Sequence, residues 1–421
     1  MTGSAAAGHL SVVTLVTLAL SGCGASDSLA GADGGSAPPV VTIEQVGGFV
    51  PDDGWIFSDQ TIHKIAINLP ASSVMAIAAD PYTFVEGGVT IDGQLVPRIG
   101  VRLRGKIGSF RTLAQKPKFK LEFDELIADQ RFYGLKALAL NNSVVDCSYL
   151  KEPLGYRIYA AAGVPAERTG FARVSVNGAD YGLYVVIEVP DDRFLKRHYA
   201  EAKGNLYDGK YLWFGGNNYT ILDFASSVDD KFGLEEGQGL DVGHQDIKAI
   251  STALAASRGN GQLVPALAPL LAWDELHRMM VVDQWTGGND SYSLNSNSYR
   301  VYFNPGDGGR MEMIPYDLDY AFLRDSDWGK SWRRPVGKLA AGCFADAACA
   351  AAHKQAVQAV IDAIDPTALL KWFDAVDALT IKDAMNDPRR ECSANGVAPL
   401  RKQLRDWVNA ENGQLRTFWG L

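Results

Sequence analysis

The sequence has no excess of positive charge. Its 421 residues include 40 Lys and Arg against 49 Asp and Glu, which gives a formal net charge of −9 at pH 7. Surfaces that bind nucleic acid usually carry clustered basic residues, interleaved with aromatic residues when they bind single strands. The sequence shows no such cluster, so we do not expect nucleic acid as a partner.

The sequence also lacks a membrane-spanning signal at its N-terminus. The apolar run at residues 10–20 is too short to cross a bilayer and is followed by Ser21-Gly22-Cys23, an ending that resembles a lipobox. We therefore predict a lipoprotein signal peptide at residues 1–23, with Cys23 as the lipidated residue, and a flexible tether at residues 24–40. The expected location is the periplasm or the cell surface, with the protein anchored to the membrane through its lipid.

Cysteine and histidine are scarce. If Cys23 is lipidated, four of the five cysteines remain in an oxidising compartment, where disulfides are expected. Cys343 and Cys349 flank a short Ala-rich loop and are the first pair we expect, which leaves Cys147 with Cys392, although four thiols allow three pairings. The six histidines are scattered, and no Cys-x-x-Cys or His-x-x-x-His occurs. Zinc is therefore not expected.

The remaining composition is that of a globular protein. Hydrophobic residues make up 47% and charged residues 21% of the chain, so most of it can bury a core. Apolar residues alternate with polar ones over residues 41–190, as in half-buried strands, and recur every three to four positions over residues 191–421, as in helices. We predict the α+β class, with a β-rich N-terminal lobe and a mainly helical C-terminal lobe.

Local signals refine this division. A helix is predicted at residues 150–161, ended by Gly163, and Asn177-Gly178 predicts a hairpin turn. The run Asn-Pro-Gly-Asp-Gly-Gly at residues 304–309 predicts a second hairpin, the only β structure expected in the helical region. The helices expected there are at residues 247–256, 263–284, 356–364 and 397–418.

The second hairpin brings two polar segments together. Asp290 and Asn295 precede it, and Asp317 and Asp319 follow it. Such oxygens hold Mg²⁺ while leaving positions for water and substrate phosphates. An Asp, an Asn five residues later, a hairpin and a further Asp is also the order of the catalytic base and metal ligands in protein kinases. Ordinary turn and cap residues give the same pattern, so both interpretations remain open.

Two basic or glycine-rich elements precede this region. Lys116, Lys118 and Lys120 alternate with apolar residues, so they share one strand face opposite the core. A kinase uses a lysine on an early strand to hold nucleotide phosphates. Gly105 and Gly108 allow a turn whose backbone N–H groups approach an anion. A solvated strand face and an ordinary turn would give the same two patterns.

Together these motifs resemble the spore-coat-protein-H (CotH) kinase family. The similarity lies between residues 43 and 322. In chain order the matching motifs are Val101-Arg-Leu-Arg-Gly-Lys-Ile-Gly-Ser109, Lys116-Pro-Lys-Phe-Lys120, Leu140-Asn-Asn-Ser143, Gly163-Val-Pro-Ala166, Val176-Asn-Gly178, Tyr181-Gly-Leu-Tyr184 with Glu188, and Pro315-Tyr-Asp-Leu-Asp319. The resemblance implies an atypical protein-kinase-like fold that transfers the γ-phosphate of ATP, with Mg²⁺ or Mn²⁺, to Ser or Thr of surface or coat proteins.

The resemblance also implies roles for individual residues. Asp290 corresponds to the catalytic base, and Asn295, Asp317 and the neighbouring Asp319 to the metal-binding group. Asn297 is close enough in sequence to take the place of Asn295. The residues expected on the nucleotide side are Lys116 as the nucleotide lysine, Lys118, Gly105, Gly108 and Glu152 as the lysine's partner. Pro153 follows Glu152 directly, which predicts that Glu152 lies at the start of its helix.

Two other functions remain open at this stage. The periplasm and the cell exterior hold little ATP, so the chain could be a catalytically inactive, surface-anchored binding or adhesion lipoprotein with a kinase-like fold. Alternatively, the same site could transfer a nucleotidyl group, which the intact mass of the product would reveal.

Overall fold

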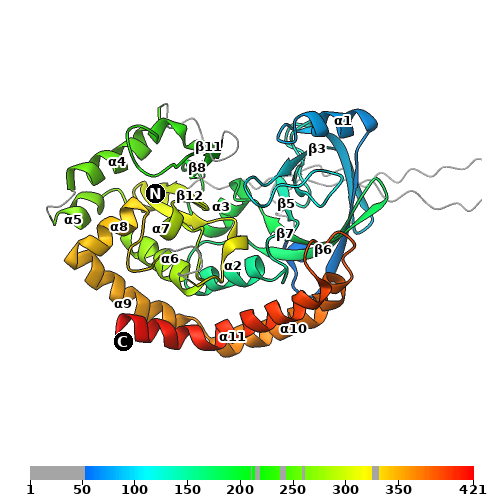
Figure 1. The fold of residues 1–421 in the computed structure, drawn as a ribbon. Coiled ribbons are helices and arrows are strands. Elements are labelled where there is room, and N and C mark those ends of the chain that lie inside the picture. Colours follow the sequence, from blue (N-terminus) through cyan, green and yellow to red (C-terminus); the bar gives the residue numbers. More distant parts are fainter. Residues whose placement is uncertain (1–52, 210, 214–218, 238–242, 258–260, 325–330) are drawn as a thin grey trace, which may run out of the picture. The chain divides into compact units, whose positions relative to one another are not determined.

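The structure is a computed structural model. It describes residues 53–209, 211–213, 219–237, 243–257, 261–324 and 331–421. Within these residues the fold is a mixture of helices and strands, which confirms the predicted α+β class (Figure 1). The predicted signal peptide, Cys23 and tether lie outside the described residues. None of the described helices is long and apolar enough to cross a membrane.

Seven strands of the N-terminal region close into a barrel. They are β1 (Ile62–Asn68), β2 (Val85–Ile91), β3 (Gln94–Arg104), β4 (Lys118–Glu122), β5 (Ala137–Asn141), β6 (Thr169–Val176) and β7 (Ala179–Glu188), in the order β1-β2-β3-β4-β5-β7-β6. The pair β1 and β6 is parallel and the other pairs are antiparallel. Alternate side chains, such as Phe119 and Leu121, fill the barrel, as the period-two pattern predicts.

Three helical elements accompany the barrel, namely a 3-10 helix (Gly54–Phe57), α1 (Ala71–Ala79) and α2 (Lys151–Ala161). Glu152 is the second residue of α2, which confirms its predicted place at the helix start. Asn177 and Gly178 both have positive φ, +49° and +80°. They form the predicted tight turn between β6 and β7, where such backbone angles match the strand twist.

Helices predominate after residue 191. They are α3 (Asp192–His198), α4 (Gln245–Ser257), α5 (Leu263–Leu267), α6 (Trp273–Trp285), α7 (Tyr292–Asn295), α8 (Lys338–Ala345), α9 (Ala347–Ala363), α10 (Pro366–Met385) and α11 (Ala394–Trp419), with short 3-10 segments at Asp229–Lys231, Pro305–Asp307 and Leu318–Tyr320. The single helix predicted at residues 263–284 is wrong. Two helices occupy these residues, because Leu271 between them pairs with Met311.

A four-stranded sheet lies among these helices. Its order is β11 (Gly233–Glu236), β8 (Leu206–Asp208), β12 (Tyr299–Asn304) and β13 (Arg310–Pro315), and a separate pair is formed by β9 (Leu212–Trp213) and β10 (Tyr219–Thr220). The β12–β13 hairpin is as predicted. The expectation that it is the only β structure in this region is wrong, because β8 and β11 pair in the same sheet. These two strands could not be predicted because they are too short to show a clear alternation.

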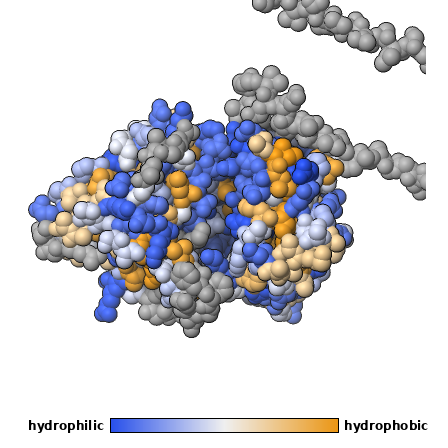
Figure 2. Space-filling view, turned by 90° about the horizontal axis from the view of Figure 1, so that it is seen from above, coloured by the Kyte–Doolittle hydropathy of each residue, from blue (hydrophilic) through white to orange (hydrophobic). Residues whose placement is uncertain are grey.

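Three hydrophobic clusters organise the described residues, a small one that includes Phe194, Tyr199 and Tyr302 and two large cores. One large core fills the barrel. The other joins the outer face of β5, β6 and β7 to α2 and to most of the later helices, through residues such as Ala139, Phe171 and Leu183. This second core crosses residue 190, the predicted lobe boundary. Seen from above, the surface is hollowed near its middle, and mostly hydrophilic residues border the hollow (Figure 2).

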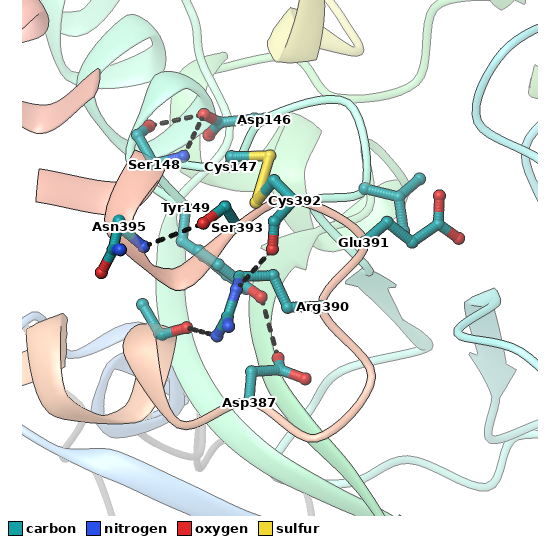
Figure 3. Close-up of a disulfide and its surroundings, with 12 residues drawn as sticks. Asp146, Cys147, Ser148, Tyr149, Asp387, Arg390, Glu391, Cys392, Ser393 and Asn395 are labelled. Carbon is teal, nitrogen blue, oxygen red and sulfur yellow. Dashed lines mark hydrogen bonds between the residues drawn. A yellow bond between two sulfur atoms is a disulfide. The ribbon is translucent and has the colours of Figure 1, made fainter. Parts of the chain in front are cut away.

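Two disulfides lie within the described residues, one between neighbouring helices and one between distant segments. Cys343–Cys349 joins α8 to α9, and Cys147–Cys392 joins the segment before α2 to the connection between α10 and α11 (Figure 3). These are the pairs expected first from the sequence. We call residues 387–392 the C-terminal clamp. The disulfide joins this connection to the segment between β5 and α2, and hydrogen bonds of Asp387 join it to Lys116 and to Leu183 of β7.

Candidate active site

Lys118 is the centre of a buried charge cluster at the outer face of the barrel. Its neighbours on β4, Phe119 and Leu121, point into the barrel, so Lys118 points away from that core. The Nζ of Lys118 donates to Asp319 Oδ2 at 2.7 Å and to Asp317 Oδ1 at 3.0 Å. Both aspartates follow β13 directly. A single ammonium group therefore bridges two carboxylates contributed by the predicted hairpin.

The charges of this cluster are unequally stabilised. Burial alone would lower the pKa of Lys118, but Asp317, Asp319 and Glu152 raise it above its ordinary value. Burial opposes ionisation of Asp317 as well, yet Lys118 and Arg104 hold its pKa below the ordinary value. By contrast, burial and the nearby Asp317 raise the pKa of Asp319 to about 7. Asp317 is thus the carboxylate that the site keeps ionised.

Asp317 also has the more accessible position. Its side chain is 37% exposed, whereas that of Asp319 is 2% exposed. Its backbone is left-handed, with φ 52° and ψ 64°, and its N–H donates to the Tyr156 hydroxyl at 3.1 Å. A non-glycine residue rarely adopts this conformation, and such residues often lie at functional sites. Asp317 is therefore the acidic residue of this pair that can reach a ligand.

Asp290 lies in the turn before α7 and is held by three side chains. Its carboxylate accepts hydrogen bonds from the amide of Asn295, from Asn297 Nδ2 at 3.0 Å and from Ser298 Oγ at 3.3 Å. Besides burial and Asp317, the charge of Asp290 contributes to the raised pKa of Asp319, so Asp290 belongs to the same electrostatic neighbourhood. The structure brings both candidate asparagines to the predicted base.

Gly105 and Gly108 belong to the connection between β3 and β4. Their φ angles are +88° and +80°, values that glycine adopts at little cost. A Cβ added at Gly108 would collide with the hydroxyl of Tyr320. Tyr320 follows Asp319 directly, so the predicted anion-binding turn lies against the acidic segment.

Lys116 has different partners. Its Nζ donates to Asp387 Oδ2 at 2.5 Å, to the Leu183 carbonyl at 2.8 Å and to the Tyr149 hydroxyl at 3.3 Å. Its side chain is 1% exposed, and this burial lowers the pKa of Lys116 to about 8. The position expected for the nucleotide lysine, next to Asp317 and Asp319, is thus occupied by Lys118. The alternative of a solvated strand face is wrong for both lysines.

Glu152 is a buried carboxylate in the electrostatic neighbourhood of Lys118. The amide of Asn141 donates to its carboxylate. Burial raises the pKa of Glu152 well above its ordinary value, and Lys118 is the group that most opposes this rise. The lysine whose charge acts most strongly on Glu152 is therefore Lys118, whereas the resemblance implied Lys116.

Two arginines near the site were not singled out from the sequence. Arg104, at the end of β3, donates to the Tyr316 hydroxyl. The guanidinium carbon of Arg300 lies 3.7 Å from the centre of the Tyr316 ring, a cation–π arrangement. After Lys118, these arginines are the groups that lower the pKa of Asp317. Arg104 belongs to the Val101–Ser109 motif, whereas Arg300 gave no signal in the sequence.

Asp387 was also missed from the sequence. It pairs with Lys116 across 271 positions, accepts a hydrogen bond from Tyr149, and lies close to the Cys147–Cys392 disulfide (Figure 3). The expected pairing of Cys147 with Cys392 was the signal that could have placed this acidic residue near Tyr149.

Two solved structures show a weak similarity to this chain. A chain of the Shewanella oneidensis MR-1 toxin–antitoxin complex of HipA, HipB and operator DNA has a TM-score of 0.34 and 12% identity, covering 89% of this chain and 76% of that chain. The Helicobacter pylori proinflammatory kinase CtkA has a TM-score of 0.32 and 11% identity, covering 74% and 93%. TM-scores of this size do not establish a shared fold.

Sequence comparison is more informative. "Inner spore coat protein H" of Bacillus subtilis (strain 168) is 26% identical over 203 residues, which are 46% of this chain and 52% of that protein. The match thus spans about half the length of this relative. The family model described as CotH kinase protein matches residues 101–360, more than half of the chain and the region that holds Lys118, Asp290, Asp317 and Asp319. The chain belongs to the CotH kinase family.

Proposed function

We propose that this chain is a metal-dependent protein kinase that transfers the γ-phosphate of ATP to Ser or Thr of proteins on the cell surface or coat. The observation that supports this function best is the bridge from Lys118 to Asp317 and Asp319. A buried lysine on an early strand, a buried glutamate near it and a partly exposed aspartate after a hairpin match the parts that protein kinases use for phosphoryl transfer.

The positive groups form the nucleotide side of the proposed site. Lys118 is oriented by its hydrogen bond to Asp319, and the charge of Glu152 favours its ammonium form. It can therefore offer that ammonium group to a phosphate oxygen in place of Asp317. Arg104 adds charge nearby. The Gly105–Gly108 turn can bring backbone N–H groups close to the phosphates, because neither glycine carries a Cβ.

The metal would bind at Asp317. Its ionised carboxylate is partly exposed, and Asn295 offers an amide oxygen beside Asp290. Among the described residues, the carboxylates of Asp290, Asp317 and Asp319 do not gather within 4.8 Å of one another. A single ionised and partly exposed carboxylate, that of Asp317, fits Mg²⁺ or Mn²⁺. Mg²⁺ usually takes one or two carboxylates and leaves its other positions to waters and substrate phosphates. When bound, the metal supplies charge neutralisation to the phosphates.

Asp290 would act as the base. Its carboxylate is oriented by Asn295, Asn297 and Ser298. The acceptor hydroxyl oxygen forms a bond to the γ-phosphorus, the bond from that phosphorus to the β,γ-bridging oxygen breaks, ADP leaves, and the hydroxyl proton passes to Asp290. Orientation and charge stabilisation then account for most of the catalysis.

The cellular setting is part of the proposal. Lipidation at Cys23 and export would hold the kinase at the membrane, with its protein substrates on the surface or coat and ATP supplied from outside the cytoplasm. The adhesion alternative becomes the better description if the chain binds no nucleotide.

The test uses the chain without the predicted signal peptide, incubated with γ-labelled ATP and Mg²⁺ or Mn²⁺. We expect label on the wild type and on Asp274→Asn, a change at an exposed carboxylate of α6, but not on Asp290→Asn or Asp317→Asn. Circular dichroism checks that each variant is folded. Equal labelling of all four proteins would reject the assigned site. Intact mass separates phosphorylation from nucleotidyl transfer.

A further inference from the structure

A second cluster of reactive side chains lies among α6, α8 and α9. It consists of His277, Cys343, Cys349 and His353, whose exposed fractions are 4%, 0%, 0% and 1%. One ring nitrogen of His277 and the two sulfurs lie within 4.8 Å of one another. The Nδ1 of His353 is 3.4 Å from the Nδ1 of His277. The phosphoryl-transfer proposal uses none of these four residues.

The fold holds these side chains in place from three helices. Cys349 and His353 are four residues apart on α9, so they share one face of that helix. Asp346 caps α9 and accepts hydrogen bonds from the N–H groups of Ala348 and Cys349, which fixes the start of the helix at this cysteine. His277 comes from α6, which packs against α9.

An aromatic shell surrounds the two histidines. Trp273 lies against His277, and Phe344 and Trp419 lie against His353, with ring centres 5.1–5.7 Å apart. The two imidazoles are thus almost fully shielded from water.

Two cysteines and two histidines form a ligand set typical of Zn²⁺. Zinc sites of this kind are tetrahedral, with Zn–S distances of about 2.3 Å and Zn–N distances of about 2.0–2.1 Å, so neighbouring ligand atoms lie about 3.3–3.8 Å apart. The two histidine nitrogens already have this spacing, at 3.4 Å. The sulfurs, which are bonded to each other in this structure, would have to move apart. His353, which does not belong to the group of three residues whose ligand atoms lie within 4.8 Å of one another, would have to approach them.

We propose that this cluster is a thiol-controlled metal site, a disulfide when oxidised and a Cys2His2 site for Zn²⁺ when reduced. Reduction by a dithiol breaks the Cys343–Cys349 bond with two electrons and two protons, and the dithiol becomes a disulfide. Binding of Zn²⁺ then releases the two thiol protons as the sulfurs coordinate as thiolates. The redox state of the compartment decides which form is present.

Zinc was not expected from the sequence, because the chain has no short Cys or His spacing typical of zinc sites. His277 is 76 positions from His353, and the packing of α6 against α9 brings the two together. The proposal is independent of kinase activity, so it stands or fails separately from the assignment of Asp290 and Asp317.

The test measures Co²⁺ binding by the purified chain before and after reduction with a phosphine, which does not bind the metal as a dithiol would. We expect one equivalent of Co²⁺ with the visible absorption of a tetrahedral thiolate site after reduction, and none before. Excess Zn²⁺ should remove this absorption. The control Cys147→Ser/Cys392→Ser keeps the four ligands and should bind Co²⁺ after reduction as the wild type does.

Two variants make the test specific. Cys343→Ser/Cys349→Ser should lose the signal, and His353→Gln should weaken binding by at least ~10–100-fold, the cost of losing even an outer partner of a metal site. Circular dichroism shows which of these two variants is folded. One folded ligand variant is enough to test whether Co²⁺ binding depends on this cluster. The proposal is overturned if the reduced, folded wild type binds no Co²⁺ or if a folded ligand variant binds it equally well.

Discussion

Lys116 and Lys118 are two residues apart, share one face of the same chain segment and are almost equally buried, at 1% and 2% exposure. Their carboxylate partners nevertheless come from different elements. Lys118 meets two carboxylates from the hairpin, and its pKa is raised although burial opposes this. Lys116 meets one carboxylate, Asp387 of the C-terminal clamp, and burial outweighs it and lowers the pKa to about 8.

The difference shows that a strand pattern cannot assign a role to a lysine. Both positions satisfy the alternation equally. What distinguishes them is the element packed on each side chain, the β12–β13 hairpin on Lys118 and the clamp on Lys116. We infer that Lys118 serves the chemistry and that Lys116 fastens the clamp to the barrel.

The largest expected effect is on catalysis. In Lys118→Met the ammonium group that can bind a phosphate is lost, so we expect phosphoryl transfer to fall at least ~10²–10³-fold, the cost of removing one preorganised donor. Initial rates of labelling measure this. Lys116→Met is the opposing variant, and it should retain most activity at a temperature at which it is folded. The reverse result would restore Lys116 as the nucleotide lysine.

The next effect is on stability. Lys116→Met leaves the Asp387 carboxylate buried without its ammonium partner, although hydrogen bonds from Tyr149 and the Leu183 N–H remain. Breaking a buried pair in this way costs about 3–5 kcal/mol, which urea denaturation can measure. The double variant Lys116→Met/Asp387→Asn should recover part of the loss, and a loss below 1 kcal/mol in the single variant would contradict a fastening role.

A smaller loss is expected when the covalent part of the clamp is removed. Cys147→Ser/Cys392→Ser should lower the free energy of unfolding by about 2–4 kcal/mol, because the unfolded chain is no longer constrained. Kinase activity at low temperature should change little, since Lys118, Asp317 and Asp319 keep their contacts. The Cys343–Cys349 disulfide closes only a six-residue separation, so Cys343→Ser/Cys349→Ser should lower the free energy of unfolding by less. A larger loss of unfolding free energy in Cys343→Ser/Cys349→Ser than in Cys147→Ser/Cys392→Ser would contradict this expectation.

The smallest expected effect is on the pH dependence of stability, which should differ between Lys116 and Lys118. The folded-state pKa of Lys116 is about 8, below the ordinary value of 10.5, so between these values the unfolded chain holds a proton that the folded chain has released. Stability should therefore rise with pH in this window, by at most about 1.4 kcal/mol per pH unit. Lys118 has a folded pKa above 10.5, so its contribution is constant below that pH.

Urea denaturation at pH 8, 9 and 10 tests this difference. The stability of the wild type relative to Lys116→Met should grow across the series, whereas its stability relative to Lys118→Met should stay constant. Parallel profiles for both variants would mean that Lys116 stays protonated in its buried pair.

Much of the fold was predictable because it depends on local signals. The barrel strands alternate, Asn177-Gly178 specifies its own turn, and the glycines after Asn304 allow little except a hairpin. Strands β8 and β11 have three and four residues, which is too few for a period to emerge. The break between α5 and α6 arises from pairing of Leu271 with a strand that follows later in the chain.

The site was predictable only up to the level of segments. The order of Asp290, Asn295 and Asp317 indicated which acidic residues the hairpin brings near one another. The choice of Lys118 over Lys116 depends on contacts across 199, 201 and 271 positions, and the role of Arg300 depends on its stacking on Tyr316. Such contacts follow from tertiary packing, which one sequence does not reveal.

The disulfide Cys147–Cys392 has a topological consequence. Its partners are 245 positions apart, so the segment with Asp290, Asp317 and Asp319 lies inside a covalent ring. A single cut by a protease anywhere in that ring leaves one molecule, which would show two fragments on a gel only after reduction. For a protein expected outside the cytoplasm, a nick in a surface loop would then open the ring without releasing the acidic half of the site.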